Sequence, residues 1–352
     1  MAKQNGITAP IKLSAVGDVL LHGRVYGGLN KKENFILEKQ MSKVKKHIKS
    51  SDLAIANLET PIAGIDYGLS GFPRFNAPEE IGIALKNLGI DIVSLANNHV
   101  LDQGVNGLYK TIENLEKIGL PYDGAFKSLE DSETLRVFNI NNLKICILSF
   151  TSHMNGLKLP TGKEFLVNTL LYTSIVRISR LLRKIKREKI ADVIILNMHF
   201  GEEYHLEPTA RQKELARTFS DAGADVILGH HPHVLQPPEW IENSKGTKSF
   251  VAYSLGNFIS GQNGLHRQIG AVLSLEISKP DDIYNNIKIE NPRYNLTYVN
   301  REERLRYDVY PFQEWIKDNE YIITKEGKFE SEEIYNNVSN RLTKYISNLT
   351  VT

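Results

Sequence analysis

The sequence lacks several features that would place it outside the class of ordinary globular proteins. It contains one cysteine, Cys146, so an internal disulfide is excluded. Cys146 lies in the apolar run 144–150, which predicts a buried strand, and a thiol in such a run indicates core packing rather than catalysis. The sequence has no run of about 18 apolar residues, so it predicts no integral membrane segment.

The N-terminal residues and the net charge exclude two further classes. Residues 1–12 lack the apolar stretch of about 7–15 residues that a signal peptide needs, so we expect a cytoplasmic chain. A chain trimmed at its N-terminus would give the same pattern and could be membrane-associated or extracellular. The formal net charge is only +2, and the basic runs 43–49 and 177–189 follow helical patterns, which indicates solvated helix faces. We therefore expect no nucleic-acid partner.

Short apolar runs alternate with helical patterns through the first two-thirds of the 352 residues, which predicts an α/β layered fold. Beyond about Pro280 this periodicity weakens, so we expect one domain over 1–280 and a C-terminal appendage over 281–352 packed on the core. The expected strands are 11–16, 53–58, 91–96, 135–139, 144–150, 192–198, 225–228, 250–254 and 270–277, with a hairpin turn at Asn141-Asn142. The expected helices are 35–49, 78–88, 104–118, 168–188, 209–222 and a final one near 331–349.

Side chains that bind metals follow several of these strands, at the end of an open α/β sheet where ligands bind. They are Asp18, Glu59, Asn98, His99, His199, His230, His231 and His233. Taken singly, Asp18 and Glu59 could be turn or capping residues, and His199 could be a structural histidine. Three histidines within four positions beside Pro232 indicate more than chance. The mixture of donors suits Mn, Fe or Zn better than Ca or Mg, so we expect one or two divalent transition-metal ions.

Six motifs in chain order resemble those of one known family. They are 16–18 (VGD), 57–61 (NLETP), 96–104 (ANNHVLDQG), 199–204 (HFGEEY), 223–234 (GADVILGHHPHV) and 253–258 (YSLGNF). Over roughly residues 12–260 the chain resembles the CapA family of poly-γ-glutamate capsule biosynthesis, whose PGA_cap domain is related to calcineurin-like metallophosphoesterases. The resemblance implies a four-layer α/β/β/α metallophosphoesterase-like sandwich, here with the C-terminal appendage.

The resemblance also implies a role for each matching residue. The metal ligands would be Asp18, Glu59, Asn98, His199, His231 and His233, with Glu59 at the bridging position and His230 as the other possible member of the terminal histidine pair. His99 would protonate or stabilise the leaving group. Asp102 could orient His99 or cap the helix 104–118. Asn257 could line the pocket or close a turn, and Arg74 could bind an anionic substrate or lie on the surface.

Two departures from the superfamily pattern leave the number of ions open. Leu20 stands where the first motif normally has a histidine, and His22 could either substitute for it or have a supporting or surface role. Glu59 is one methylene longer than the usual bridging aspartate. Fold alone does not establish hydrolysis. Three hypotheses follow: a metal-dependent hydrolase acting on a phosphoester or on an amide or acyl bond of an anionic polymer, a non-hydrolytic polyanion-binding component working with capsule-synthesis partners, and a silent interaction module.

Overall fold

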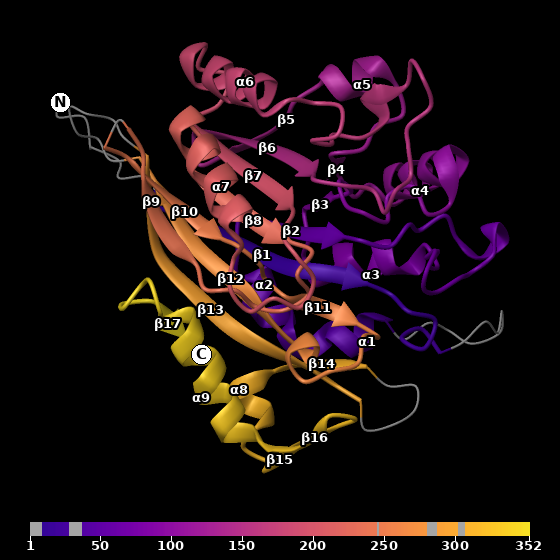
Figure 1. Ribbon diagram of the computed structural model, residues 1–352, viewed down its shortest axis with the longest axis vertical. Helices are drawn as coiled ribbons and strands as arrows, with labels where there is room; N and C mark the ends of the chain where they lie inside the picture. Colours follow the sequence, from indigo (N-terminus) through magenta and orange to yellow (C-terminus); the bar gives the residue numbers. More distant parts are fainter. Residues whose placement is uncertain (1–8, 28–36, 245, 280–286, 302–306) are drawn as a thin grey trace, which may run out of the picture.

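Two β-sheets packed face to face form the centre of the computed structural model (Figure 1), which describes residues 9–27, 37–244, 246–279, 287–301 and 307–352. In this part of the chain the larger sheet has nine strands. Seven follow the order β14 (Asp308–Pro311), β13 (Lys288–Asn300), β12 (Ile269–Ser278), β1 (Ile11–Leu20), β2 (Leu53–Leu58), β3 (Ile92–Ser94) and β4 (Tyr122–Asp123), while β11 (Asn257–Ser260) pairs with β1 and β17 (Thr350–Val351) with β13. The six strands of the smaller sheet follow the order β5 (Arg136–Ile140), β6 (Leu143–Thr151), β7 (Val193–His199), β8 (Val226–His230), β10 (Lys248–Ala252) and β9 (Glu239–Glu242).

Helices cover the outer face of each sheet. The larger sheet packs on α1 (Leu37–Met41), α2 (Lys45–Lys49), α3 (Glu80–Leu88) and α4 (Gly104–Ile118). The smaller sheet packs on α6 (Ile175–Arg187) and α7 (Ala210–Ala222), and the short α5 (Leu129–Glu133) precedes β5. Between the sheets, Leu13 and Ile55 of one share a buried apolar cluster with Ile195 and Phe250 of the other. The structure therefore confirms the expected four-layer α/β/β/α sandwich.

The pattern of apolar residues explains why β7 lies inside the sandwich. Val193 and Ile195 face the cluster between the sheets, whereas Ile194 and Leu196 face the helices. A strand covered on both faces needs such a continuous apolar run. The expected turn at Asn141 and Asn142 is also confirmed, because both residues have positive φ (45° and 65°) and β5 and β6 pair as antiparallel neighbours.

A bulge in β1 extends that strand beyond the expected end at Val16. The pairing with β2 passes from Val16 opposite Ala56 to Asp18 opposite Asn57, so Gly17 is left without a partner in this ladder. A Cβ atom at Gly17 would fall on the carbonyl group of Gly256, so the bulge needs a glycine. The chain continues as a strand to Leu20 because its end pairs with β11.

Two expected helices differ from the structure. The helix expected over 168–188 begins at Ile175, because the Ser174 side chain caps it and accepts a hydrogen bond of 3.2 Å from the Arg177 amide. The preceding residues lie along the end of β6, where the Thr151 amide donates to the Asn168 carbonyl. In the helix expected over 35–49, residues 35 and 36 lie outside the described residues. The remainder is divided into α1 and α2 by the 3₁₀ turn Ser42–Val44.

The C-terminal residues both extend the larger sheet and cover part of it (Figure 1). β13 and β14 join this sheet beside β12. They are followed by α8 (Phe312–Trp315), a hairpin of β15 (Tyr321–Thr324) and β16 (Gly327–Glu330), and α9 (Ser331–Leu342). Phe312, Val338 and Leu342 add to the cluster between the sheets. The boundary expected at residue 280 lies outside the described residues, and the two-part division stays a prediction. In the described part of the chain, every helix is too short or too polar to cross a membrane.

Candidate metal centre

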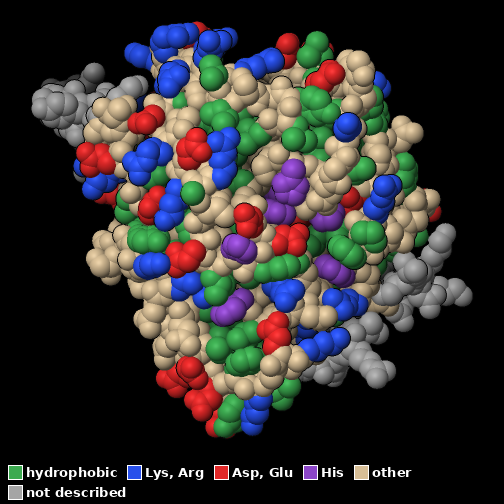
Figure 2. Space-filling model, in the orientation of Figure 1, with side chains coloured by type: hydrophobic (Ala, Val, Ile, Leu, Met, Phe, Trp, Pro, Cys, Tyr) green, Lys and Arg blue, Asp and Glu red, His purple; other side chains and the backbone are tan. Residues whose placement is uncertain are grey.

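Buried polar side chains from both sheets meet at the rim where the strands end. The set consists of Asp18, Asn57, Glu59, Asn98, His199, His230, His231, His233 and Asn257, each at most 4% exposed. Histidine side chains gather near the middle of the face in Figure 2, with acidic side chains beside them. The strand-end residues, which are spread over more than two hundred positions, therefore share one site, as the spacing along the chain predicted.

The Asp18 carboxylate contacts four other residues of the site. Its Oδ1 accepts a hydrogen bond of 2.8 Å from Asn57 Nδ2 and lies 3.4 Å from His230 Nδ1. Its Oδ2 lies 3.0 Å from His233 Nδ1 and 3.3 Å from the His231 amide nitrogen, which donates to it. Because the β1 bulge places Asp18 opposite both Asn57 and Asn257, the backbone register determines these contacts.

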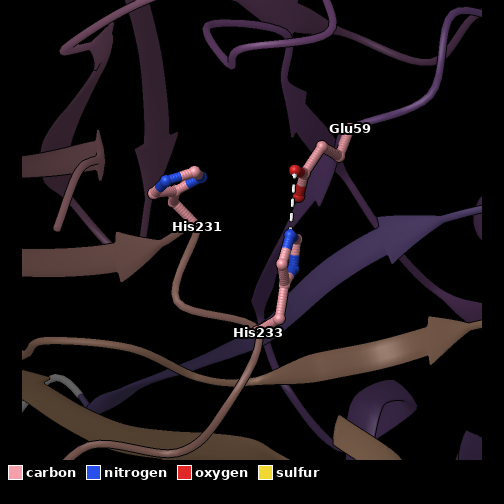
Figure 3. A group of neighbouring side chains, drawn as sticks. All are labelled: Glu59, His231 and His233. Carbon is pink, nitrogen blue, oxygen red and sulfur yellow. Dashed lines mark ion pairs between the residues drawn. The ribbon is translucent and has the colours of Figure 1, made fainter. Parts of the chain in front are cut away.

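Glu59 follows β2 directly and joins the two halves of the site. Its Oε1 lies 3.7 Å from His199 Nε2 and 3.6 Å from His233 Nε2. Two groups of donor atoms, each within 4.8 Å of one another, contain this residue: Glu59 with His231 and His233, and Glu59 with Asp18 and His199. Figure 3 shows Glu59 and His233 pointing toward each other with the His231 imidazole beside them. Glu59 thus stands where one side chain can serve two ions.

His199 and Asn98 form the other side of the site. His199 Nε2 lies 3.0 Å from Asn98 Oδ1, and Asn98 Nδ2 donates to Asn155 Oδ1 at 3.2 Å. The Asn98 amide is therefore oriented with its oxygen toward the imidazole. Ligands that share one ion at about 2.0–2.2 Å stand roughly 3.0–3.6 Å apart. The donor distances in the site fall close to that range.

Several atoms of the site that could bind a metal have no hydrogen-bond partner among the described residues. They are Glu59 Oε1, His231 Nδ1 and both ring nitrogens of His230. A buried polar atom without a partner costs free energy comparable to a lost hydrogen bond. A divalent transition metal would satisfy such carboxylate and imidazole atoms, because these are its ordinary ligands. The residues present therefore fit the metal that the family resemblance implies.

Burial and neighbouring charges set the protonation of the site. Burial alone would raise the pKa of Asp18, but the adjacent imidazoles of His230 and His233 outweigh it and hold the pKa well below its usual value. Burial and the nearby Asp18 charge raise the pKa of Glu59 well above its usual value. Burial lowers the pKa of His199 strongly and that of His231 to about 3. The imidazoles of His199 and His231 are therefore neutral at pH 7, as metal binding requires.

His99 and Asp102 form a pair beside these residues. His99 Nδ1 lies 2.8 Å from Asp102 Oδ2, which also accepts a hydrogen bond of 2.7 Å from the Phe75 amide. The Phe75 ring packs edge-on against the His99 ring at 4.7 Å. The N-cap of α4 is Gln103, which makes no side-chain cap hydrogen bond. Asp102 thus contacts His99 and does not cap the helix.

The remaining candidates lie at or near the rim. Asn257 Oδ1 lies 3.1 Å from His233 Nδ1, so its side chain contacts the cluster. His22 is partly buried, and its ring lies 5.0 Å from Phe75. It belongs to neither of the two donor groups found in the described part of the chain. Arg74 is exposed on the segment next to Phe75. A substrate contact for Arg74 stays a prediction.

Sequence reasoning missed two residues that the structure places in the site. Asn57 donates from Nδ2 to Asp18 and, at 3.2 Å, to Glu59 Oε2. His153 follows β6, and its Nε2 lies 3.3 Å from His231 Nε2. The strand-end rule that selected the other histidines applies equally to His153, so that signal was present. Only the register of β1 against β2 identifies Asn57.

The profile of the family described as "Bacterial capsule synthesis protein PGA_cap" matches residues 12–262, which include the donor residues of the site. The chain belongs to the PGA_cap family. This family is part of the metallophosphoesterase-like superfamily. The PGA_cap match ends near β11, so β12, β13 and the C-terminal residues lie beyond it.

Two curated proteins resemble this PGA_cap chain. It is 29% identical over 272 residues to "Capsule biosynthesis protein CapA" of Bacillus anthracis, and the match covers 76% of this chain and 64% of that protein. It is 34% identical over 199 residues to "PGA biosynthesis protein CapA" of Bacillus subtilis (strain 168), and the match covers 55% of this chain and 49% of that protein. The chain thus spans about half to two-thirds of the length of these relatives.

A solved structure is also similar to the chain. It is the crystal structure of a hypothetical protein from Thermus thermophilus, and it matches with a TM-score of 0.46 at 14% identity, over 81% of this chain and 98% of that one.

Proposed function

We propose that this chain is a metal-dependent hydrolase of poly-γ-glutamate capsule biosynthesis, acting on a phosphoester or on an anionic polymer. One observation carries the proposal: two groups of buried donor atoms overlap at Glu59. Two ions that share a ligand stand about 3.5–4 Å apart, as in many phosphoester hydrolases. The name of the Bacillus subtilis relative supports the assignment to polymer synthesis.

In this proposal the residues of the rim divide the work. Asp18, Asn98, His199, His231 and His233 would hold one or two divalent ions together with Glu59, which belongs to both donor groups. When bound, such ions lower the pKa of a coordinated water and polarise the bond to be cleaved. Asn57 holds Asp18 and Glu59 in position through its amide.

His99 is the candidate general acid. Asp102 can accept a hydrogen bond from the N–H group at His99 Nδ1, which fixes the orientation of the ring and leaves Nε2 for the substrate. A proton held on Nε2 would pass to the leaving-group oxygen. Because Asp102 is also fixed by the Phe75 amide, the pair is held before substrate binds.

Metal analysis combined with turnover assays tests the proposal. Purified protein should contain Mn, Fe or Zn, and should hydrolyse bis-p-nitrophenyl phosphate, p-nitrophenyl phosphate or poly-γ-glutamate. His199→Ala should lose both metal and turnover. His47→Ala serves as a matched control, because it removes an imidazole from α2 on the outer face of the larger sheet. Protein that contains no transition metal, or turnover that survives His199→Ala, would contradict the hydrolase.

A second function is favoured by one observation, the buried apolar Leu20 where the superfamily has a histidine. With one ligand fewer, the site would bind a polyanion together with capsule-synthesis partners and would not turn it over. Bound metal and bound poly-γ-glutamate without any hydrolysis in the same assays would select this function.

A further inference from the structure

A four-residue loop after β11 lies against three arginine side chains. We call residues 261–264 (GQNG) the arginine loop. Arg24 Nη2 donates to the Gly261 carbonyl, and Arg301 Nη1 donates to Asn263 Oδ1 at 3.0 Å. The Arg267 amide donates to the Gly264 carbonyl at 3.2 Å. Arginines from three distant parts of the chain therefore meet on one short segment.

The two glycines of the arginine loop leave room for guanidinium groups. A Cβ atom at Gly261 would stand 2.5 Å from His22 Cβ and 2.9 Å from Arg24 Nε, and one at Gly264 would stand 2.5 Å from Arg267 Nε. Gly264 also has a φ of 114°, which other residues rarely adopt. A side chain at Gly261 would displace His22 and Arg24, and one at Gly264 would displace Arg267.

The arginine loop is connected directly to the candidate metal centre. Asn257 contacts His233 through Oδ1, and its Nδ2 donates to Gln262 Oε1 at 3.0 Å and to the Arg267 carbonyl at 2.9 Å. The Arg267 guanidinium lies 4.4 Å from the centre of the Tyr204 ring, whose centre is 6.2 Å from that of His233. The arginine loop and Arg267 therefore lie beside the metal centre, and Arg24 and Arg301 reach it through their contacts with the loop.

The positive charge of Arg24, Arg267 and Arg301 is only partly neutralised. Arg267 pairs with Glu326 at 3.3 Å. In the described ranges no carboxylate lies within ion-pair distance of Arg24 or Arg301, and Arg301 Nε and Nη2 are buried without a hydrogen-bond partner. Burial lowers the pKa of Arg301 to about 10, and nearby Arg24 and Arg267 act in the same direction. Buried donors of this kind remain costly until an acceptor reaches them.

We propose that Arg24, Arg267 and Arg301 form a subsite for an oxyanion of the substrate, a carboxylate or a phosphate group next to the bond held at the metal centre. Guanidinium groups bind both kinds of oxyanion through paired hydrogen bonds. The proposal rests on the proposed function only in placing a reacting bond at the metal centre. A polymer that carries an acid group on every unit would occupy the metal centre with one unit and this subsite with the next.

Calorimetric titration of the full chain with two probes tests the subsite. The probes are tetra-γ-glutamate and tripolyphosphate, and the titrations are made without free metal. The salt concentration is kept constant, because salt screens the attraction between exposed charges. Replacing all three arginines (R24Q, R267Q and R301Q together) should weaken binding of the better probe at least about tenfold. The matched control R177Q, R180Q and R183Q removes the same charge from exposed positions on α6 and should change affinity less than about twofold.

Two further variants separate the subsite from the metal centre and from misfolding. Asp18→Asn, which should lose metal, should lose the contribution of the metal centre to the affinity for the better probe and keep the contribution of the three arginines. Arg→Lys at the three positions keeps the charge and should recover only part of the loss if paired hydrogen bonds matter. An unchanged metal content in the triple glutamine variant shows that the rim is intact.

The outcomes divide cleanly. Binding of tetra-γ-glutamate identifies a carboxylate source, and binding of tripolyphosphate alone identifies a phosphate source. The proposal is overturned if wild-type protein binds neither probe. It is also overturned if the triple variant binds as tightly as wild type, or if the α6 control loses as much affinity.

Discussion

The interior between the two sheets and the rim above it are equally buried but opposite in chemistry. Ile195 and His199 lie four residues apart on β7 and are 0% and 1% exposed. Ile195 belongs to the apolar cluster between the sheets, whereas His199 contacts Asn98 and Glu59. Burial favours the first residue and penalises the second unless a partner compensates. The interior therefore stabilises the fold, and the rim holds buried polar atoms, some of them without a partner, that a bound ion could satisfy.

The largest expected effect comes from breaking the rim. Asp18→Asn should abolish metal binding and lower turnover by at least about a thousandfold, because the contacts to His230, His231 and His233 all involve this carboxylate. Elemental analysis and steady-state rates check both parts. A variant that keeps its metal would contradict the role of Asp18.

Breaking the interior should give the reverse pattern. Phe250→Ala removes a fully buried ring between the sheets, and we expect the free energy of unfolding to fall by about 3–5 kcal/mol. Metal per folded chain should not change. Denaturant unfolding with elemental analysis of the folded fraction measures the two quantities. If the metal content falls together with stability, the two regions are not separable.

A smaller effect should separate catalysis from metal binding within the rim. His99→Asn removes the candidate general acid, and turnover should fall about a hundredfold with metal content unchanged. Asp102→Asn should give a similar loss and shift the pH profile, because Asp102 contacts His99 Nδ1. Steady-state rates from pH 5 to 9 measure this. Unchanged rates in both variants would leave His99 with a packing role against Phe75.

The smallest expected effect concerns Asp123, a buried acid in β4 that belongs to neither donor group. Burial raises its pKa to about 7, against the opposing influence of Arg136 and Ser149. The folded protein therefore holds a proton that the unfolded chain releases near pH 4, so stability falls as pH rises toward 7. Relative to Asp123→Asn, wild type should lose about 2 kcal/mol between pH 5 and 6.5. Parallel pH curves in urea unfolding would contradict the raised pKa.

Local sequence patterns predicted the parts of the fold that depend on local interactions. α4 has the expected bounds, since an amphipathic pattern precedes Gly119, which takes the left-handed conformation at the helix end. β7 was predicted from its apolar run, and the strand-end rule then placed His199 in the site. Ser174, the N-cap residue, could have indicated the start of α6, but the helical pattern of apolar residues continues on its N-terminal side and predicts an earlier start.

The remaining features depend on pairing between distant segments, which one sequence does not reveal. The β1 bulge requires the pairing of Val16 and Asp18 with β2, and only this register brings Asn57 to Asp18. β13 was not expected, because its first half is largely exposed and polar. The contacts of Arg24 and Arg301 with the arginine loop likewise join residues more than 30 positions apart.

The close approach of Gly17 to Gly256 has a consequence for how this site can be altered. A methyl group at position 17 carries no charge and removes no metal-binding atom. It would nevertheless clash with the Gly256 carbonyl and push β1 away from the segment that carries Asn257. The carboxylate of Asp18 would then move relative to His233 by a fraction of the added width. The arrangement of the candidate ligands therefore depends on the space around the main chain as much as on the choice of side chains, and Gly17→Ala would change it with every candidate ligand still present.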